Sequence, residues 1–252
     1  MKILTISAYG FQKLLREKVI FSFAFIAIVL ILISLLLGAM SFDEQIRFLV
    51  HFGSAGRLFS LLGISLIYGS TIIQREIDSQ TILLTLARPL SRSIYFIGQW
   101  LALVWVIILN GLILSGILFL LTEMTLPLSA FVISMLALLL QVLVVLTISM
   151  FFSMITRSVI SFFAGLGIYL AGHWTPDLIY FAQKSKNDFF ISFADIAHQF
   201  FPQLYRLNIQ SYHLIQTQKF SDQLGQSFVH GFGWLVFFLI LSLLTFRRKD
   251  LV

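Results

Sequence analysis

The polar residues of this chain that are best suited to chemistry gather in one segment, at positions 75–92. It combines cations and a carboxylate with a proline that a helix cannot continue through: Arg75, Glu76, Arg88, Pro89 and Arg92. The arginines offer charge-assisted hydrogen bonds, and Leu84 and its neighbours offer an apolar contact. The pattern fits either an interfacial helix anchored by arginines or a docking element for a cytoplasmic partner, and the residues alone leave both open.

Motifs for catalysis are missing from the sequence. An ATP site of the chain's own needs G-x-x-x-x-G-K-[ST], and none of the 15 glycines is followed by Lys. H-E-x-x-H and G-x-S-x-G do not occur either. An intramembrane protease would need a pair such as Ser65 and His173, but serine is common in membrane helices. We therefore expect a chain that is not an enzyme and that binds no cofactor or metal.

Composition defines the elements that must position these residues. Of the 252 residues, 59% are hydrophobic and only 11% are charged, and the mean hydropathy is +0.96. A soluble domain carries about 25% charged residues, so this chain lacks the charge to cover a surface that faces water. The absence of Cys excludes a disulfide scaffold and a thiol enzyme. An all-α integral membrane protein of several spans remains.

Long runs without charge predict six transmembrane helices, since about 20 apolar residues cross the hydrocarbon core. We expect them at about 19–40, 58–74, 95–121, 127–153, 158–175 and 229–246. Residues 2–17 have a basic amphipathic pattern that is typical of a helix in the headgroup plane, although an extension of the first span would fit as well. The outer loop, 175–228, is too long for a bare connection and should contain short helices. We treat 1–252 as one transmembrane domain.

The distribution of Lys and Arg predicts the orientation. With both termini inside, the inner segments hold eleven basic and four acidic residues, and the outer segments, which include Arg57, hold six and seven. The net charge of +6 is therefore a signal of topology, and a nucleic-acid partner is not expected. All five histidines fall on the outer side, but their spacings match no metal-ligand pattern.

A few polar and small residues lie within the expected spans, whose centres carry no acid or base. Asn110 and Gln141 fit hydrogen bonds between helices, or they line a substrate path. A cluster of small residues in the fifth span would allow close helix packing, either at a dimer seam or within the chain: Gly165, Gly167, Ala171 and Gly172. Nothing in the spans identifies a substrate.

The string R-E-I-D-S-Q-T-I-L-L-T-L-A-R-P-L-S-R-S-I-Y-F-I-G at 75–98 resembles the signature of type-two (ABC-2-like) ABC exporter permeases. The positions that match the family pattern are Glu76, Thr81, Leu84, Pro89, Ser91, Arg92 and Gly98. Two positions depart from it, because Gln80 stands where Gly often precedes the Thr, and Gln99 stands where Lys often follows the Gly. The six-span layout and the F-P-Q-L-Y-R-L-N run at 201–208 extend the resemblance over the whole chain.

The resemblance implies a role. Residues 75–92 would form a cytoplasmic coupling helix that docks on a separate ATPase subunit, which binds ATP and magnesium. This chain would be the permease subunit of an ATP-driven exporter in the inner membrane of a prokaryote. It would pair with a second permease chain, identical or related, and with two ATPase subunits. The alternative function is a membrane scaffold that transports nothing and anchors a cytoplasmic ATPase for envelope assembly or signalling.

Overall fold

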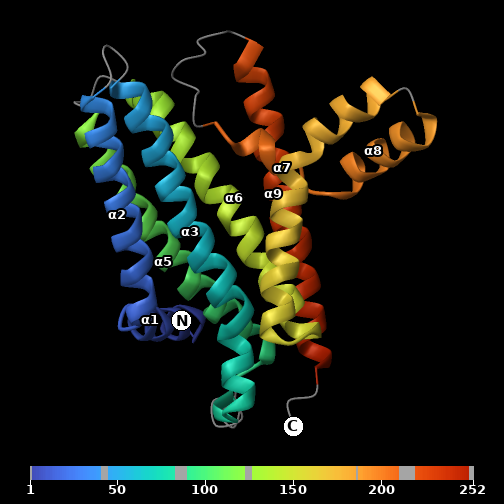
Figure 1. Ribbon diagram of the computed structural model, residues 1–252. Coiled ribbons are helices and arrows are strands. Elements are labelled where there is room, and N and C mark those ends of the chain that lie inside the picture. The colour runs from blue at the N-terminus through green and yellow to red at the C-terminus, as the bar shows by residue number, and fades with distance from the viewer. Residues whose placement is uncertain are drawn as a thin grey trace.

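The computed structural model describes residues 2–40, 45–82, 90–122, 127–185, 187–209 and 219–249, with only the backbone of 219–223. These residues form α-helices and one short 3-10 helix, and none of them is in a strand (Figure 1). The helices are α1 (Lys2–Leu14), α2 (Lys18–Ala39), α3 (Gln45–Asp78), α5 (Arg92–Leu121), α6 (Leu128–Ile155), α7 (Ser158–Ser185), α8 (Asp188–Phe200), η1 (Leu204–Leu207) and α9 (Lys219–Arg248). The predicted all-α class is confirmed.

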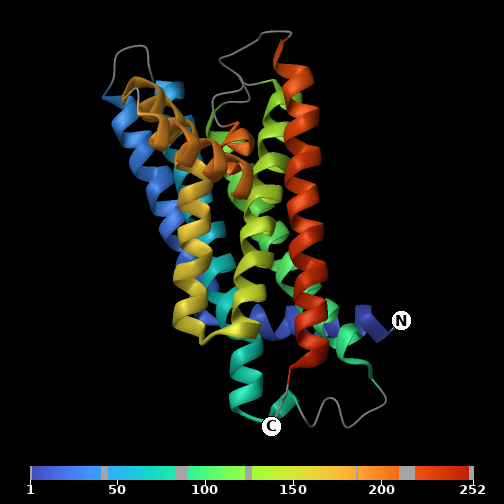
Figure 2. The ribbon, with the colours of Figure 1, turned by 90° about the vertical axis from the view of Figure 1, so that its right-hand side faces the viewer.

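Five of these helices are long and apolar enough to cross a membrane: α2, α3, α5, α6 and the Leu224–Arg248 part of α9. The chain is therefore a multi-pass membrane protein. The expected fifth span, 158–175, lies within α7, which is not one of the five. Its glycines and His173 lower the hydropathy of this helix. In both ribbon views α7 nevertheless runs along α6 for much of its length (Figures 1 and 2).

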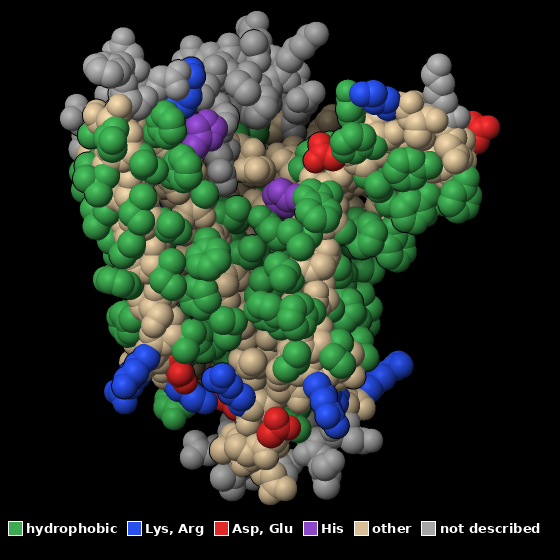
Figure 3. All heavy atoms as spheres, viewed as in Figure 1, with side chains coloured by type: hydrophobic (Ala, Val, Ile, Leu, Met, Phe, Trp, Pro, Cys, Tyr) green, Lys and Arg blue, Asp and Glu red, His purple; other side chains and the backbone are tan. Residues whose placement is uncertain are grey.

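The long helices pack side by side, and α1 lies across one end of them at the foot of α2 (Figures 1 and 2). This end also holds the ends of α3 and α9. On the face seen in Figure 3, hydrophobic side chains cover the middle, and most Lys and Arg side chains gather at this same end. We call it the charged end.

Glycines on α3 let its neighbours approach closely. A Cβ at Gly56 would lie 3.3 Å from the backbone oxygen of Ala27 in α2, and one at Gly69 would lie 3.0 Å from the Cβ of Ser149 in α6. Small residues allow such contacts between membrane helices. As a result α3 lies at the centre of the bundle, and its end at 75–78 is held in a defined position.

α3 is longer than the second span that was expected from the sequence. The second span was expected to begin at residue 58, with Arg57 in an outer segment, but α3 begins at Gln45 and Arg57 lies inside it. Only 3% of the surface of Arg57 is exposed. The charge therefore marks no helix boundary, and the interior of the bundle does contain a basic residue.

Candidate functional site

The end of α3 is the most prominent feature of the charged end. Arg75 and Asp78 are exposed there, and α3 projects beyond the neighbouring helices (Figures 1 and 2). After Asp78 the helix closes, because Ser79 N–H donates to Arg75 O at 3.0 Å and Gln80 N–H donates to Ile77 O at 2.9 Å. The result is an exposed helical tip that ends in a tight turn.

Gln80 is the residue that makes this turn. Its φ is +55°, a left-handed conformation that commonly ends helices and that glycine adopts at least cost. Thr81 follows it and donates its hydroxyl to Glu76 O at 3.4 Å. A Gly at position 80, as in the family pattern, would suit this backbone better than the Gln that is present.

Glu76 contacts other parts of the same chain. Its Oε1 pairs with Lys13 Nζ of α1 at 3.1 Å, and both carboxylate oxygens accept from Gln99 Nε2 of α5 at 3.4 Å. The Glu76 side chain is 14% exposed. Its carboxylate therefore connects α1, α3 and α5, and Gln99 supplies a neutral donor where the family pattern has Lys.

The C-terminal part of the predicted segment 75–92 forms the start of α5. Ser91 caps this helix, because its hydroxyl accepts from Ile94 N–H at 3.3 Å. Arg92 then reaches the end of α9, where its Nη1 donates to Arg247 O at 3.2 Å and to Lys249 O at 2.8 Å. Arg247 in turn donates from its Nε to Ser93 Oγ at 2.7 Å. Arg92 thus joins α5 to α9.

Other bonds hold the neighbouring helix ends together. Gln74 of α3 donates through Nε2 to the backbone oxygen of Ser153 and also to that of Thr156, at 2.9 Å. Lys249 Nζ also reaches Ser153 O, at 3.5 Å. Partial burial lowers the pKa of Lys249, and the charge of Asp78 acts in the opposite direction. The ends of α3, α5, α6 and α9 therefore form one connected unit.

Three predicted docking residues, Leu84, Arg88 and Pro89, lie outside the described residues. The described part of the 75–92 segment divides into two groups. Arg75 and Thr81 are exposed at the tip of α3, whereas Glu76 and Arg92 are bound to other helices of the chain.

Asn110 and Gln141 each make a hydrogen bond between helices. Asn110 Nδ2 of α5 donates to Ser60 Oγ of α3 at 3.3 Å. Gln141 Nε2 of α6 lies 3.0 Å from His173 Nε2 of α7, and His173 Nδ1 lies 3.2 Å from Tyr169 O. Both side chains are buried. The sequence offered no signal that Gln141 and His173 would meet.

The small residues of α7 lie in different surroundings. A Cβ at Gly165 would collide with Ser149 Oγ of α6, and one at Gly172 would collide with the backbone oxygen of Pro202. Gly167 is exposed, with open space where a Cβ would stand, and Ala171 is half-buried. Gly165 and Gly172 therefore serve packing within the chain, and Gly167 lies on a free face.

Arg57 is the functional candidate that sequence reasoning missed. Its Nη1 donates to Ser115 Oγ of α5 at 2.9 Å, and its Nη2 donates to Ser54 Oγ at 3.0 Å. Its guanidinium lies 5.5 Å from the ring centre of Phe131 in α6, and Nε has no partner within the described part of the chain. Neutral side chains thus surround the guanidinium of Arg57, whose positive charge costs free energy to bury.

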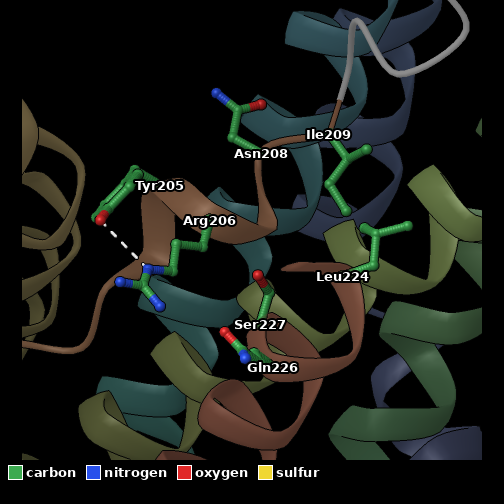
Figure 4. Close-up of a pocket in the computed structure, with 7 residues that line it drawn as sticks. All are labelled: Tyr205, Arg206, Asn208, Ile209, Leu224, Gln226 and Ser227. Atoms are coloured by element: carbon green, nitrogen blue, oxygen red, sulfur yellow. Dashed lines mark hydrogen bonds between the residues drawn. The ribbon is translucent and has the colours of Figure 1, made fainter. Parts of the chain in front are cut away.

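The opposite end of the bundle carries a pocket of about 400 Å³ between η1 and the start of α9 (Figure 4). Arg206, Asn208 and Ser227 are among its polar lining residues. His230 lies nearby and accepts from Gln203 N–H at 3.2 Å and from Trp234 Nε1 at 3.1 Å. Within the described ranges no group of three or more His, Asp or Glu side chains is placed to hold a metal ion.

These features define a class: a helical membrane protein of several spans, with most Lys and Arg side chains on the face in Figure 3 gathered at one end. The profile of the family described as ABC-2 family transporter protein matches residues 56–251. The chain belongs to this family, which confirms the resemblance. No curated protein matches the sequence. Membership supports a membrane permease of an ABC transporter, and it implies ABC ATPase subunits as partners. Members are generally transmembrane subunits without catalytic activity.

Proposed function

We propose that this chain is the permease subunit of an ATP-driven exporter, and that a cytoplasmic ATPase docks on the exposed tip of α3. The observation that carries the proposal is the tip itself, which projects beyond the bundle and exposes Arg75, Asp78 and Ser79. A second permease chain and two ATPase subunits that bind ATP and magnesium complete the transporter. The membrane is the inner membrane of a prokaryote, with the charged end in the cytoplasm.

Six spans fit this function better than five. Thr156, just after α6, is bonded to Gln74 at the charged end, and Lys249, just after α9, is bonded to Arg92 there. These contacts support a crossing of the bundle between α6 and α9, and α7 is the helix in that stretch of the sequence that runs along α6 (Figure 2). With α7 as a span, both termini lie on the cytoplasmic side.

The bonds at the charged end suggest how movement would spread. A displacement of the docked tip moves α3 as a rigid body. Glu76 passes this movement to α1 and α5, and Arg92 passes it from α5 to α9. Arg92 acts here as a positioning residue, because its Nη1 donates to two carbonyl groups of the chain itself.

Single cysteines test the docking surface, since the chain has none of its own. Ser79→Cys at the tip should form a cross-link to the co-expressed ABC ATPase, and an impermeant maleimide should not reach it from outside intact cells. The matched control is Phe189→Cys on α8, which is 80% exposed near the opposite end and should label from outside. Outside labelling of Ser79→Cys would contradict the proposal.

Transport itself needs a separate measurement. The reconstituted permease and ATPase should show ATP turnover that depends on the cargo, and Arg75→Ala should lower this turnover. Arg157→Ala, which changes an exposed arginine between α6 and α7, is the matched control and should leave it unchanged. ATP turnover that no cargo affects would favour the scaffold function instead.

A further inference from the structure

A second basic site lies at the elbow where α1 meets α2. A pocket of about 530 Å³ opens there, lined by Tyr9, Gln12, Lys13, Arg16, Glu17, Lys18 and Val19. Three of these residues are cations and one is an acid, so the pocket has an excess of positive charge. Lys13 is paired with Glu76. Arg16 and Lys18 are exposed, and neither side chain is bonded to a neighbour among the described residues.

The backbone adds to this positive charge. α2 begins at Lys18 with no acidic residue in its first turn, and its N-cap residue Glu17 makes no capping bond with its side chain. Free N–H groups at the start of a helix attract anions. The end of α1 is closed by comparison, because Glu17 N–H donates to Leu14 O at 2.9 Å and Arg16 N–H donates to Lys13 O at 3.2 Å.

An apolar surface continues directly from this site along α2. Lys18 shares a helix face with large hydrophobic side chains whose exposed fractions are about one half or more: Phe21 at 60%, Phe25 at 67%, Leu32 at 51% and Leu36 at 65%. α1 lies across the foot of α2 (Figure 1), which places the elbow where the apolar face begins. A ligand that fits both parts has an anionic head and long hydrocarbon chains.

We propose that the elbow binds the headgroup phosphate of an anionic phospholipid, and that the acyl chains lie along the exposed face of α2. Arg16 and Lys18 hold the phosphate together with the first amides of α2, while Lys13 remains with Glu76. The bound lipid fixes the angle between α1 and α2 from the membrane side. This inference does not depend on the proposed transport function.

Lipid selectivity tests the site. The full-length protein is reconstituted in phosphatidylcholine vesicles that contain spin-labelled phosphatidylglycerol or spin-labelled phosphatidylcholine, and the motionally restricted fraction of each label is measured. The wild-type chain should favour phosphatidylglycerol. Arg16→Gln and Lys18→Gln should each reduce this preference about fivefold, which corresponds to about 1 kcal/mol per basic residue near an anionic surface. Arg157→Gln is the matched control on the same end and should retain the full preference.

Three results would overturn the inference. The first is an unchanged preference in the Arg16→Gln, Lys18→Gln double variant. The second is release of the labelled lipid by inorganic phosphate alone, which would identify the site as one for the free ion. The third is that neither label shows a motionally restricted fraction while Phe25→Cys forms a disulfide between two copies of the chain. That result would assign the α2 face to a second chain. An Arg16→Lys variant that keeps the preference for phosphatidylglycerol would support the role of charge.

Discussion

Arg92, the first residue of α5, donates from Nη1 to the backbone carbonyl of Lys249, 2.8 Å away at the end of α9. The two residues are 157 positions apart in the sequence. Because the same nitrogen also bonds Arg247 O, one exposed arginine holds the last turn of the last membrane helix against the start of α5.

Arg92→Lys should loosen this end of α9. A lysine ammonium lacks the planar geometry of the guanidinium and should satisfy the two carbonyls less well. We expect a loss of about 1 kcal/mol, seen as a roughly fivefold faster hydrogen exchange of the amides at 244–248. Arg157→Lys, an exposed arginine between α6 and α7, should leave this exchange unchanged. Equal exchange in wild type and Arg92→Lys would show that the contact does not hold α9.

Gln80→Gly should stabilise the protein. The left-handed backbone at Gln80 costs a side-chain-bearing residue about 1–2 kcal/mol, and glycine adopts it without that cost. Chemical denaturation in one detergent should therefore show a gain of about 1 kcal/mol. The control is Gln12→Gly on an exposed face of α1, where glycine should cost about 1 kcal/mol. A loss of stability in Gln80→Gly would contradict the turn geometry.

Gly165→Ala and Gly167→Ala should differ in sign. The added methyl group at Gly165 meets Ser149 Oγ and lies 3.0 Å from Leu66 Cδ2, so we expect overpacking to cost about 1–3 kcal/mol. At Gly167 the methyl group enters open space, and the better helix propensity of Ala should stabilise by up to about 1 kcal/mol. Thermal unfolding of both variants in the same detergent measures the difference. Loss of dimer in Gly167→Ala alone would instead assign that face to a seam between chains.

Ser115→Ala should destabilise the chain, although the substitution itself is small. It removes the acceptor of Arg57 Nη1 and leaves a buried donor of a cation without a partner, at a cost of about 1–3 kcal/mol. Denaturation of the detergent-solubilised protein measures this loss. Ser134→Ala is the control, because that hydroxyl donates only to Phe131 O of its own helix. Equal stability of the two variants would mean that Ser115 does not support Arg57.

The helices were predictable where apolar residues run without interruption. The expected first span, 19–40, differs by one residue at each end from α2, because no charge lies between Lys18 and Met40. Arg57 broke the corresponding run in α3. Its burial depends on Ser54 and Ser115, and the pairing of Ser115 with α3 follows from tertiary structure that no local pattern encodes.

The candidate site was predictable as a segment but not as a set of contacts. The cluster at 75–92 includes the exposed end of α3, and the departure at Gln80 marks the turn. Arg92 and Glu76 were assigned to a partner protein, whereas their donors and acceptors in the structure belong to α9, α1 and α5. Charge in a short segment indicates a need for polar partners, but the sequence does not say whether these belong to the same chain.

The position of α1 has a consequence for biosynthesis. Its face with Gly10 packs against α5, where a Cβ at Gly10 would lie 2.9 Å from the Cβ of Ala102. The ribosome makes α1 before α5, so this partner surface does not exist until the chain has grown beyond residue 102. During that interval α1 lacks its main packing partner. The packing of α1 is thus completed only after α2, α3 and the start of α5 have been made.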